Sequence, residues 1–114
     1  MANVQNPTTF TIVDAKATAD KVTAFRLLLS QTSGGPYTLA STDDAVSSLT
    51  QGTDPSGNAT FTGAIASLNL GLAPGTWYAV AEAKNAGGYS ANSPEVAFDI
   101  VPPPPSPPTG FSVA

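Results

Sequence analysis

The chain has neither cysteine nor histidine among its 114 residues. Without cysteine it can form no disulfide framework and no thiolate nucleophile. Without histidine it lacks the usual general base of a catalytic triad and the commonest ligand of zinc, copper and haem iron. Its carboxylates are scattered over predicted turns and form no recognisable acid–base pair. We therefore expect no enzymatic activity, no cofactor and no metal site.

Charge is also scarce. Lys and Arg total 4 and Asp and Glu total 8, so charged residues make up 11% of the chain, and the formal net charge is −4. Such a chain cannot present the basic face that binds a nucleic-acid backbone. No apolar run approaches the roughly 18 residues of a membrane-spanning helix. Residues 1–7 lack the basic and apolar regions of a secretory signal. We expect neither a nucleic-acid nor a membrane partner.

What the chain does have is the alternation that is typical of β-strands. Hydrophobic residues make up 41% of the chain, and its 10 glycines and 11 prolines punctuate the alternating segments. The alternating segments are residues 8–13, 22–31, 37–40, 59–72, 76–85 and 95–101. No segment shows a helical period. The pattern predicts an all-β fold, a β-sandwich of about seven strands, in one domain over residues 1–101.

The alternation also predicts which side chains fill the core. Residues 22–31 form the most apolar segment, and we expect one face of it to be exposed to solvent at Arg26. In residues 76–85, Trp77 falls on one face and Glu82 on the other, so the second face is at least partly solvated. The predicted core residues are Phe10, Phe25, Leu27, Leu29, Leu70, Trp77, Ala81, Phe98 and Ile100.

A polar stretch, residues 42–58, is expected to form a long loop with at most an irregular strand. Asp43, Asp44 and residues 54–58 carry the oxygen ligands that calcium takes. Their spacing does not match the calcium loop of an EF-hand. Capping of turns by Asp, Ser and Asn side chains is the simpler interpretation, and we prefer it.

The aromatic residues allow a weak contact with carbohydrate. Exposed Trp77, Tyr37, Tyr78 or Tyr89 could stack on sugar rings. In the alternative that we prefer, Trp77 belongs to the core and the tyrosines close turns.

Two sequence strings resemble the second half of a fibronectin type III domain. They are Leu-Ala-Pro-Gly-Thr-Trp-Tyr at 72–78 and Ala-Lys-Asn-Ala-Gly-Gly-Tyr-Ser at 83–90, followed by Ser93. In that family a Leu-x-Pro-Gly turn leads into an aromatic corner, and an Ala-x-Asn-x-x-Gly turn precedes a last strand that contains serine. The resemblance implies an immunoglobulin-like β-sandwich, in which residues 22–40 are the C and C′ strands and residues 8–13 the B strand.

The chain departs from the family at two places. Phe10 or Ile12 stands where the B strand of the family has its core tryptophan. The positions of Ala83 and Asn85 also fall one residue early relative to Tyr78. Because of this offset, we expect the Trp77 side chain to point inward and Tyr78 not to be the corner tyrosine.

The C-terminal segment, residues 102–114, is the most unusual part of the chain. Residues 101–108 hold six of the eleven prolines, so this run is a stiff spacer of about 3.1 Å per residue, roughly 20 Å over seven residues. Residues 109–114 then resemble the A strand that opens a fibronectin type III domain, with Phe111 and Val113 on one face. The residues expected to make contacts are Pro102, Pro103, Pro104, Pro105, Pro107, Pro108, Phe111 and Val113.

The N-terminal residues, in contrast, leave little room for an A strand before residue 8, so the chain is one strand out of phase. Three explanations stay open. The chain is excised from a tandem array, or the segment lends its strand to a neighbouring subunit by β-augmentation, or the segment returns to its own sandwich.

Domains of this resemblance are found in bacteriophage virion proteins and in bacterial extracellular proteins, which leaves three functions. The first is a structural protein of a bacteriophage virion that decorates or stabilises the capsid surface, with a tail location next. It would be made in the host cytoplasm and bind copies of itself and a major capsid or tail protein. The second is an extracellular spacer or binding module excised from a secreted bacterial glycoside hydrolase or adhesin. The third is a filament subunit that uses strand donation. The unsignalled Met start and the strand-like C-terminal segment favour the first.

Overall fold

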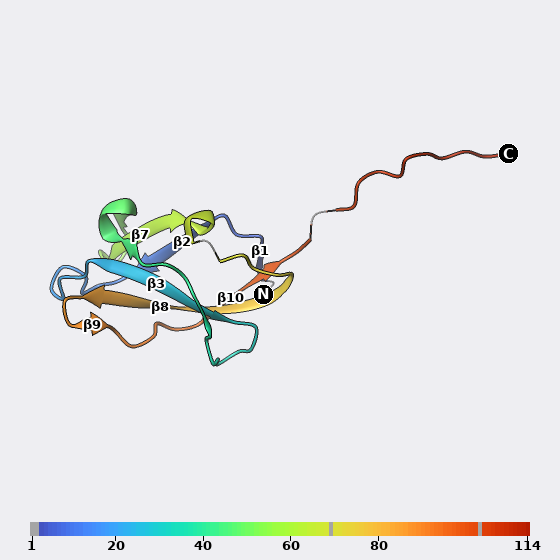
Figure 1. Ribbon diagram of the computed structural model, residues 1–114. Helices are drawn as coiled ribbons and strands as arrows, with labels where there is room; N and C mark the ends of the chain where they lie inside the picture. Colours follow the sequence, from blue (N-terminus) through green and yellow to red (C-terminus); the bar gives the residue numbers. More distant parts are fainter. Residues whose placement is uncertain (1–2, 69, 103) are drawn as a thin grey trace.

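The computed structural model describes residues 3–68, 70–102 and 104–114. The fold is all-β, with two sheets packed face to face and a C-terminal segment that extends away from them (Figure 1). This extension makes the molecule 73 Å long but only 29 and 27 Å across. Over the described ranges, no helix is long and apolar enough to cross a membrane.

The larger sheet has the strand order β1-β10-β8-β3-β4, with β5 paired to β3 and β9 paired to β8. Its pairs are antiparallel, except that β1 runs parallel to β10. The longest ladder joins β3 to β8 and sets Leu27 opposite Ala81. The bounds are β1 Val4–Gln5, β3 Ala24–Ser30, β4 Leu39–Ala40, β5 Asp44–Ala45, β8 Gly75–Asn85, β9 Gly88–Tyr89 and β10 Val96–Ile100.

The smaller sheet has the antiparallel order β2-β7-β6. Its strands are β2 Thr9–Val13, β7 Ala59–Ala64 and β6 Thr50–Thr53. Two short 3₁₀ turns lie beside its last two strands in sequence: η1 Val46–Ser48 precedes β6, and η2 Ile65–Leu68 follows β7. In β2, Phe10 and Ile12 face the larger sheet and pack against its buried residues. The alternate residues Thr9, Thr11 and Val13 are exposed.

The core lies between the sheets in two adjoining clusters. One is centred on Leu29, which is fully buried, and the other on Phe25, whose ring lies 4.9 Å from that of Phe61. Five predicted core residues are buried as expected: Phe25, Leu27, Leu29, Trp77 and Phe98. The other four are half-buried at its edges: Phe10, Leu70, Ala81 and Ile100. The sequence pattern missed Leu49 and Phe61, which are also buried.

Two predicted segments differ from the structure. Residues 59–72 do not form one strand, because β7 ends at Ala64 and the 3₁₀ turn η2 follows. Leu70 and Leu72 still reach the core from irregular backbone. Residues 42–58 contain more structure than the predicted loop, namely β5, η1 and β6. Because all the side chains of β6 are exposed, this strand shows no apolar alternation.

The N-terminal residues also differ from the prediction. They do form a strand, β1, before β2, although the sequence left little room for one. This strand pairs with β10 of the larger sheet and not with β2, so Val4 lies opposite Phe98. Among the described residues, therefore, no strand pairs with the outer edge of β2, where an A strand would lie.

Candidate functional site

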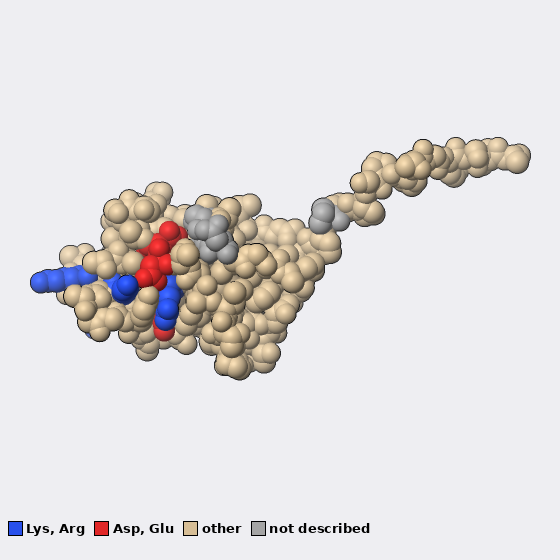
Figure 2. Space-filling model, viewed as in Figure 1, with Lys and Arg blue, Asp and Glu red and all other residues tan. Residues whose placement is uncertain are grey.

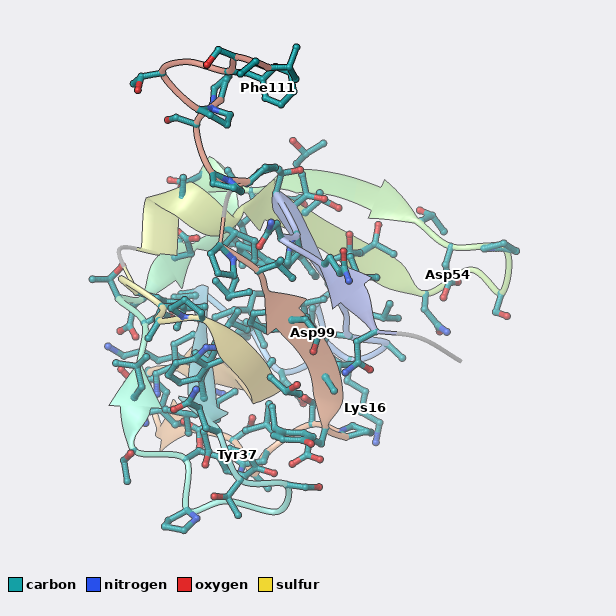
Figure 3. The ribbon with its side chains drawn as sticks, turned by 90° about the vertical axis from the view of Figure 1, so that its right-hand side faces the viewer. Lys16, Tyr37, Asp54, Asp99 and Phe111 are labelled. Carbon is teal, nitrogen blue, oxygen red and sulfur yellow. The ribbon has the colours of Figure 1, made fainter. Side chains whose placement is uncertain are left out.

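The C-terminal segment carries the predicted contact residues. Beyond β10 the described residues form no strand and are exposed, and the ribbon leads away from both sheets (Figure 1). Phe111 is 93% exposed and Val113 is 85% exposed. The other predicted contact residues are the exposed Pro102, Pro104, Pro105, Pro107 and Pro108, whereas Pro103 lies outside the described residues. The segment does not return to its own sandwich, and Phe111 stands clear of it (Figure 3).

Asn6 fixes the point where this segment leaves the sandwich. Its side chain accepts the N–H of Val101 at 2.8 Å and donates to the carbonyl of Val101 at 3.2 Å. Its own N–H donates to the carbonyl of Asp99 at 2.8 Å. Asn6 has a φ of 44°, a left-handed conformation that asparagine adopts more readily than most residues. The segment therefore starts at the end of the sandwich where β2 begins.

A charged cluster crosses the outer face of the larger sheet and consists of Arg26, Asp43, Glu82, Lys84 and Tyr89. The Arg26 Nε donates to Glu82 Oε1 at 2.8 Å, and the guanidinium carbon lies 3.6 Å from the centre of the Tyr89 ring. The pKa of Arg26 is raised, first by its hydrogen bond with Glu82. Figure 2 shows charged side chains gathered toward the end of the molecule away from the C-terminal segment.

Tyr89 ties the same cluster to Asp43, the residue before β5. Its hydroxyl lies 2.8 and 2.9 Å from the carboxylate oxygens of Asp43 and donates to them, and Lys84 Nζ lies 3.1 Å from Asp43 Oδ2. The pKa of Asp43 is lowered, first by the Tyr89 hydrogen bond and then by Lys84. The two cations and two carboxylates neutralise one another, so the cluster braces the sheet and presents no net charge to a ligand.

Three of the four aromatic side chains considered for sugar stacking make contacts within the fold. Trp77 is 9% exposed and its Nε1 donates to the carbonyl of Ala73 at 2.9 Å, which confirms that it belongs to the core. The Tyr89 ring is covered on one face by Arg26. The Tyr37 hydroxyl donates to Glu95 and so ties the turn between β3 and β4 to the residue before β10, which agrees with the turn role predicted for this tyrosine.

The acidic residues of 42–58 have different roles, and one of them caps a turn. Asp54 Oδ1 accepts the N–H groups of Ser56 at 3.0 Å and Asn58 at 2.8 Å, which confirms the capping interpretation for this residue. Asp43 is held by Tyr89 and Lys84 as described above. Among the described residues, no group of three or more Asp or Glu side chains lies close enough to hold a metal ion.

A feature that the sequence pattern did not predict is a groove of about 320 Å³ beside the end of β2. Ile12, Phe25 and Ala83 are among its apolar lining residues, and residues 90–94 form one wall. This wall is held to β8 by two serines. Ser93 Oγ accepts the Ala81 N–H at 2.8 Å, and Ser90 Oγ accepts the Ala83 N–H at 2.9 Å. The spacing Ser-x-x-Ser after a Gly-Tyr turn is the sequence signal of this wall.

Comparison with known proteins gives no match: no family model, no curated protein and no solved structure matches the chain.

Proposed function

We propose that the chain is a non-enzymatic structural protein of a bacteriophage virion, which decorates or stabilises the capsid surface. Its residues 1–101 form a fibronectin type III-like domain, and residues 102–114 form an arm that joins it to neighbouring subunits and to a major capsid or tail protein. The observation that carries the proposal is the exposure of Phe111 and Val113, 93% and 85%, beyond a proline-rich run.

The arm has the physical properties of a docking segment. Burying a side chain such as Phe or Val removes it from water with a gain of roughly 1.5–3 kcal/mol. Residues 102–114 contain no charged side chain, so docking requires no charge to be desolvated. Proline cannot donate a backbone hydrogen bond, and a run of prolines is stiff and extended. The run therefore holds Phe111 away from its own domain and available to another.

The domain itself supports a fibronectin-like assignment. The Leu-Ala-Pro-Gly string leads directly into β8, where Trp77 takes the inward place expected from the sequence offset. Ser90 and Ser93 supply acceptors to β8 from the irregular start of the last strand. The virion assignment itself relies on analogy between folds, since the same sandwich serves many functions.

Two experiments test this function. Deleting residues 102–114 should leave a folded monomer, seen by circular dichroism and light scattering, which no longer assembles or binds its particle. Immunogold electron microscopy with an antibody against the purified chain should label phage particles of the producing culture on their heads. Labelling of tails would support the second location. Label found in the culture fluid but on no particle would contradict the proposal and favour a secreted module.

A further inference from the structure

The edge of β2 offers an unpaired row of backbone groups. Ile65 donates its N–H to the carbonyl of Thr8, and Asp14 donates its N–H to the carbonyl of Ala59. Backbone groups in an antiparallel pair point toward the partner at every second residue. In β2, therefore, Phe10 and Ile12 bond to β7, while the N–H and C=O groups of Thr9, Thr11 and Val13 point to the other edge, where the described residues place no strand.

The core is incomplete along this same edge. Phe10 and Ile12 face inward and contact both core clusters, yet both stay half-buried. Val13 is 53% exposed, and the groove of about 320 Å³ opens beside Ile12. A strand added beside β2, with apolar side chains on its inward face, would cover Phe10 and Ile12 and fill the groove.

The C-terminal segment has the pattern that this edge requires. Gly110–Ala114 matches the five residues of β2 in length, and its apolar residues stand two apart. If Ser112 lies opposite Thr11 in an antiparallel pair, Phe111 falls beside Ile12 and Val113 beside Phe10. Both apolar side chains then point inward, because residues directly opposite each other share a face. A shift of one residue would turn both toward water.

Strand direction decides which copy supplies the segment. The segment leaves its own sandwich at Val101, beside the start of β2, as the Asn6 bonds show. If it folded back, it would run in the same direction as β2, and the proline run opposes such a turn. An antiparallel strand must enter from the other end of β2, at Val13. A second copy, arranged head to tail, supplies it in that direction.

From this geometry, and resting on the proposed role of the arm, we infer that the β2 edge binds Gly110–Ala114 of a second copy as an added antiparallel strand. Each copy then donates one strand and accepts one. Because the donating and accepting surfaces differ, the contact is heterologous and builds either a closed ring or an open row of subunits.

Cysteine cross-linking tests the predicted register, because the natural chain has no cysteine. A full chain with Thr11→Cys is mixed with one carrying Ser112→Cys under mild oxidation, and the product is mapped by mass spectrometry. The matched control places the acceptor at Thr53, on β6 at the opposite edge of the same sheet (Thr53→Cys). We expect a mixed disulfide between positions 11 and 112, formed at least tenfold faster than with the control.

A second pair of variants tests the edge itself. Thr11→Pro removes an outward N–H without removing a bond to β7, whereas Thr11→Ala keeps that N–H. Light scattering should give the monomer mass of 11.4 kDa for Thr11→Pro and a larger mass for Thr11→Ala and the natural chain. Circular dichroism checks that Thr11→Pro is folded, and the cross-linking test does not depend on it.

The outcomes separate this inference from the proposed function. Suppose that Phe111→Asp abolishes assembly. If the cross-link then forms at position 53, or if folded Thr11→Pro still assembles, the β2 site is overturned and the arm remains the joining element. Unchanged assembly of Phe111→Asp would overturn both. If the natural chain stays monomeric and the Thr11→Cys and Ser112→Cys chains form no mixed disulfide, self-docking is overturned and the arm is left to a different partner.

Discussion

The Tyr37 hydroxyl donates a hydrogen bond to the carboxylate of Glu95, which lies 58 residues further along the chain. The same carboxylate accepts the Gly34 N–H at 2.7 Å and the Ser33 hydroxyl at 2.8 Å. Three donors from the turn between β3 and β4 thus converge on one side chain next to β10. These bonds lower the pKa of Glu95, with Tyr37 as the first cause, and the Glu95 carboxylate raises the pKa of Tyr37.

This cluster should shape the dependence of stability on pH. Because the folded pKa of Glu95 is lowered, its contribution is present above the ordinary value of about 4.3 and is lost as pH falls through the folded pKa. Because the pKa of Tyr37 is raised, its contribution is present below about 10 and is lost as pH rises through the folded pKa. Thermal unfolding of the natural chain, measured across pH, should therefore show one loss of stability at acid pH and one at alkaline pH, the acid and alkaline limbs of the profile.

Two variants distinguish the limbs. Glu95→Gln should make both limbs shallower, since the hydrogen bond with Glu95 is the first cause of the raised pKa of Tyr37. Asp43, whose pKa is also lowered, keeps the rest of the acid limb. Tyr37→Phe should weaken the alkaline limb, to which the raised pKa of Lys84 also contributes. It should keep part of the acid limb, because Gly34 and Ser33 still donate to the Glu95 carboxylate. Parallel pH profiles of Glu95→Gln and the natural chain would refute the assignment.

The serine that holds the groove wall should contribute measurably to stability. Ser93→Ala leaves the Ala81 N–H without its side-chain acceptor, and a net hydrogen bond is worth about 1 kcal/mol. Urea unfolding should show a loss of that size. Ser56→Ala, at an exposed turn position, is the control and should change the free energy of unfolding by less than about 0.5 kcal/mol.

Gly63 should tolerate no larger residue. A Cβ at this position would lie 2.6 Å from Phe10 Cζ and 2.8 Å from Leu49 Cδ2, both in the core. Gly63→Ala should therefore destabilise the domain by about 1–3 kcal/mol through overpacking. A Cβ at Gly52, on β6, would have the Thr60 Oγ1 as its nearest neighbour, 3.1 Å away. A Gly52→Ala variant that lost as much stability would contradict the packing explanation.

Leu29 should be the most sensitive core position. Its side chain is 0% exposed, so Leu29→Ala should cost about 2–5 kcal/mol from lost burial and the cavity left behind. Val96, at 64% exposure, provides the comparison, and Val96→Ala should have little effect. Chemical denaturation gives both values. Similar losses for the two variants would show that the core is placed wrongly.

Where alternation was strong, the sequence predicted the fold. The segments that became β2, β3, β8 and β10 carry apolar residues at every second position, so their strands and the burial of Phe25, Leu27 and Trp77 were predictable. The strand β6 was not predictable, because its side chains are all exposed and it is held by backbone bonds to β7.

Only one half of the proposed joining site has a signal in the sequence. The proline run and the spacing of Phe111 and Val113 are the features from which we propose the arm. The acceptor could not be found there, because it depends on which edge β1 leaves open. That is decided by the pairing of Val4 with Phe98, two residues that are 94 positions apart in the sequence.

The parallel pairing of β1 with β10 has a mechanical consequence. Tension between residue 3 and the C-terminal arm pulls the two strands in opposite directions along their own axes. The backbone bond from Asn6 to Asp99 and the Asn6 side-chain bonds to Val101 then carry the load together and do not open one after another. A subunit held by its arm would meet a pulling force with this shear-loaded pair and not by peeling β10 from the sheet.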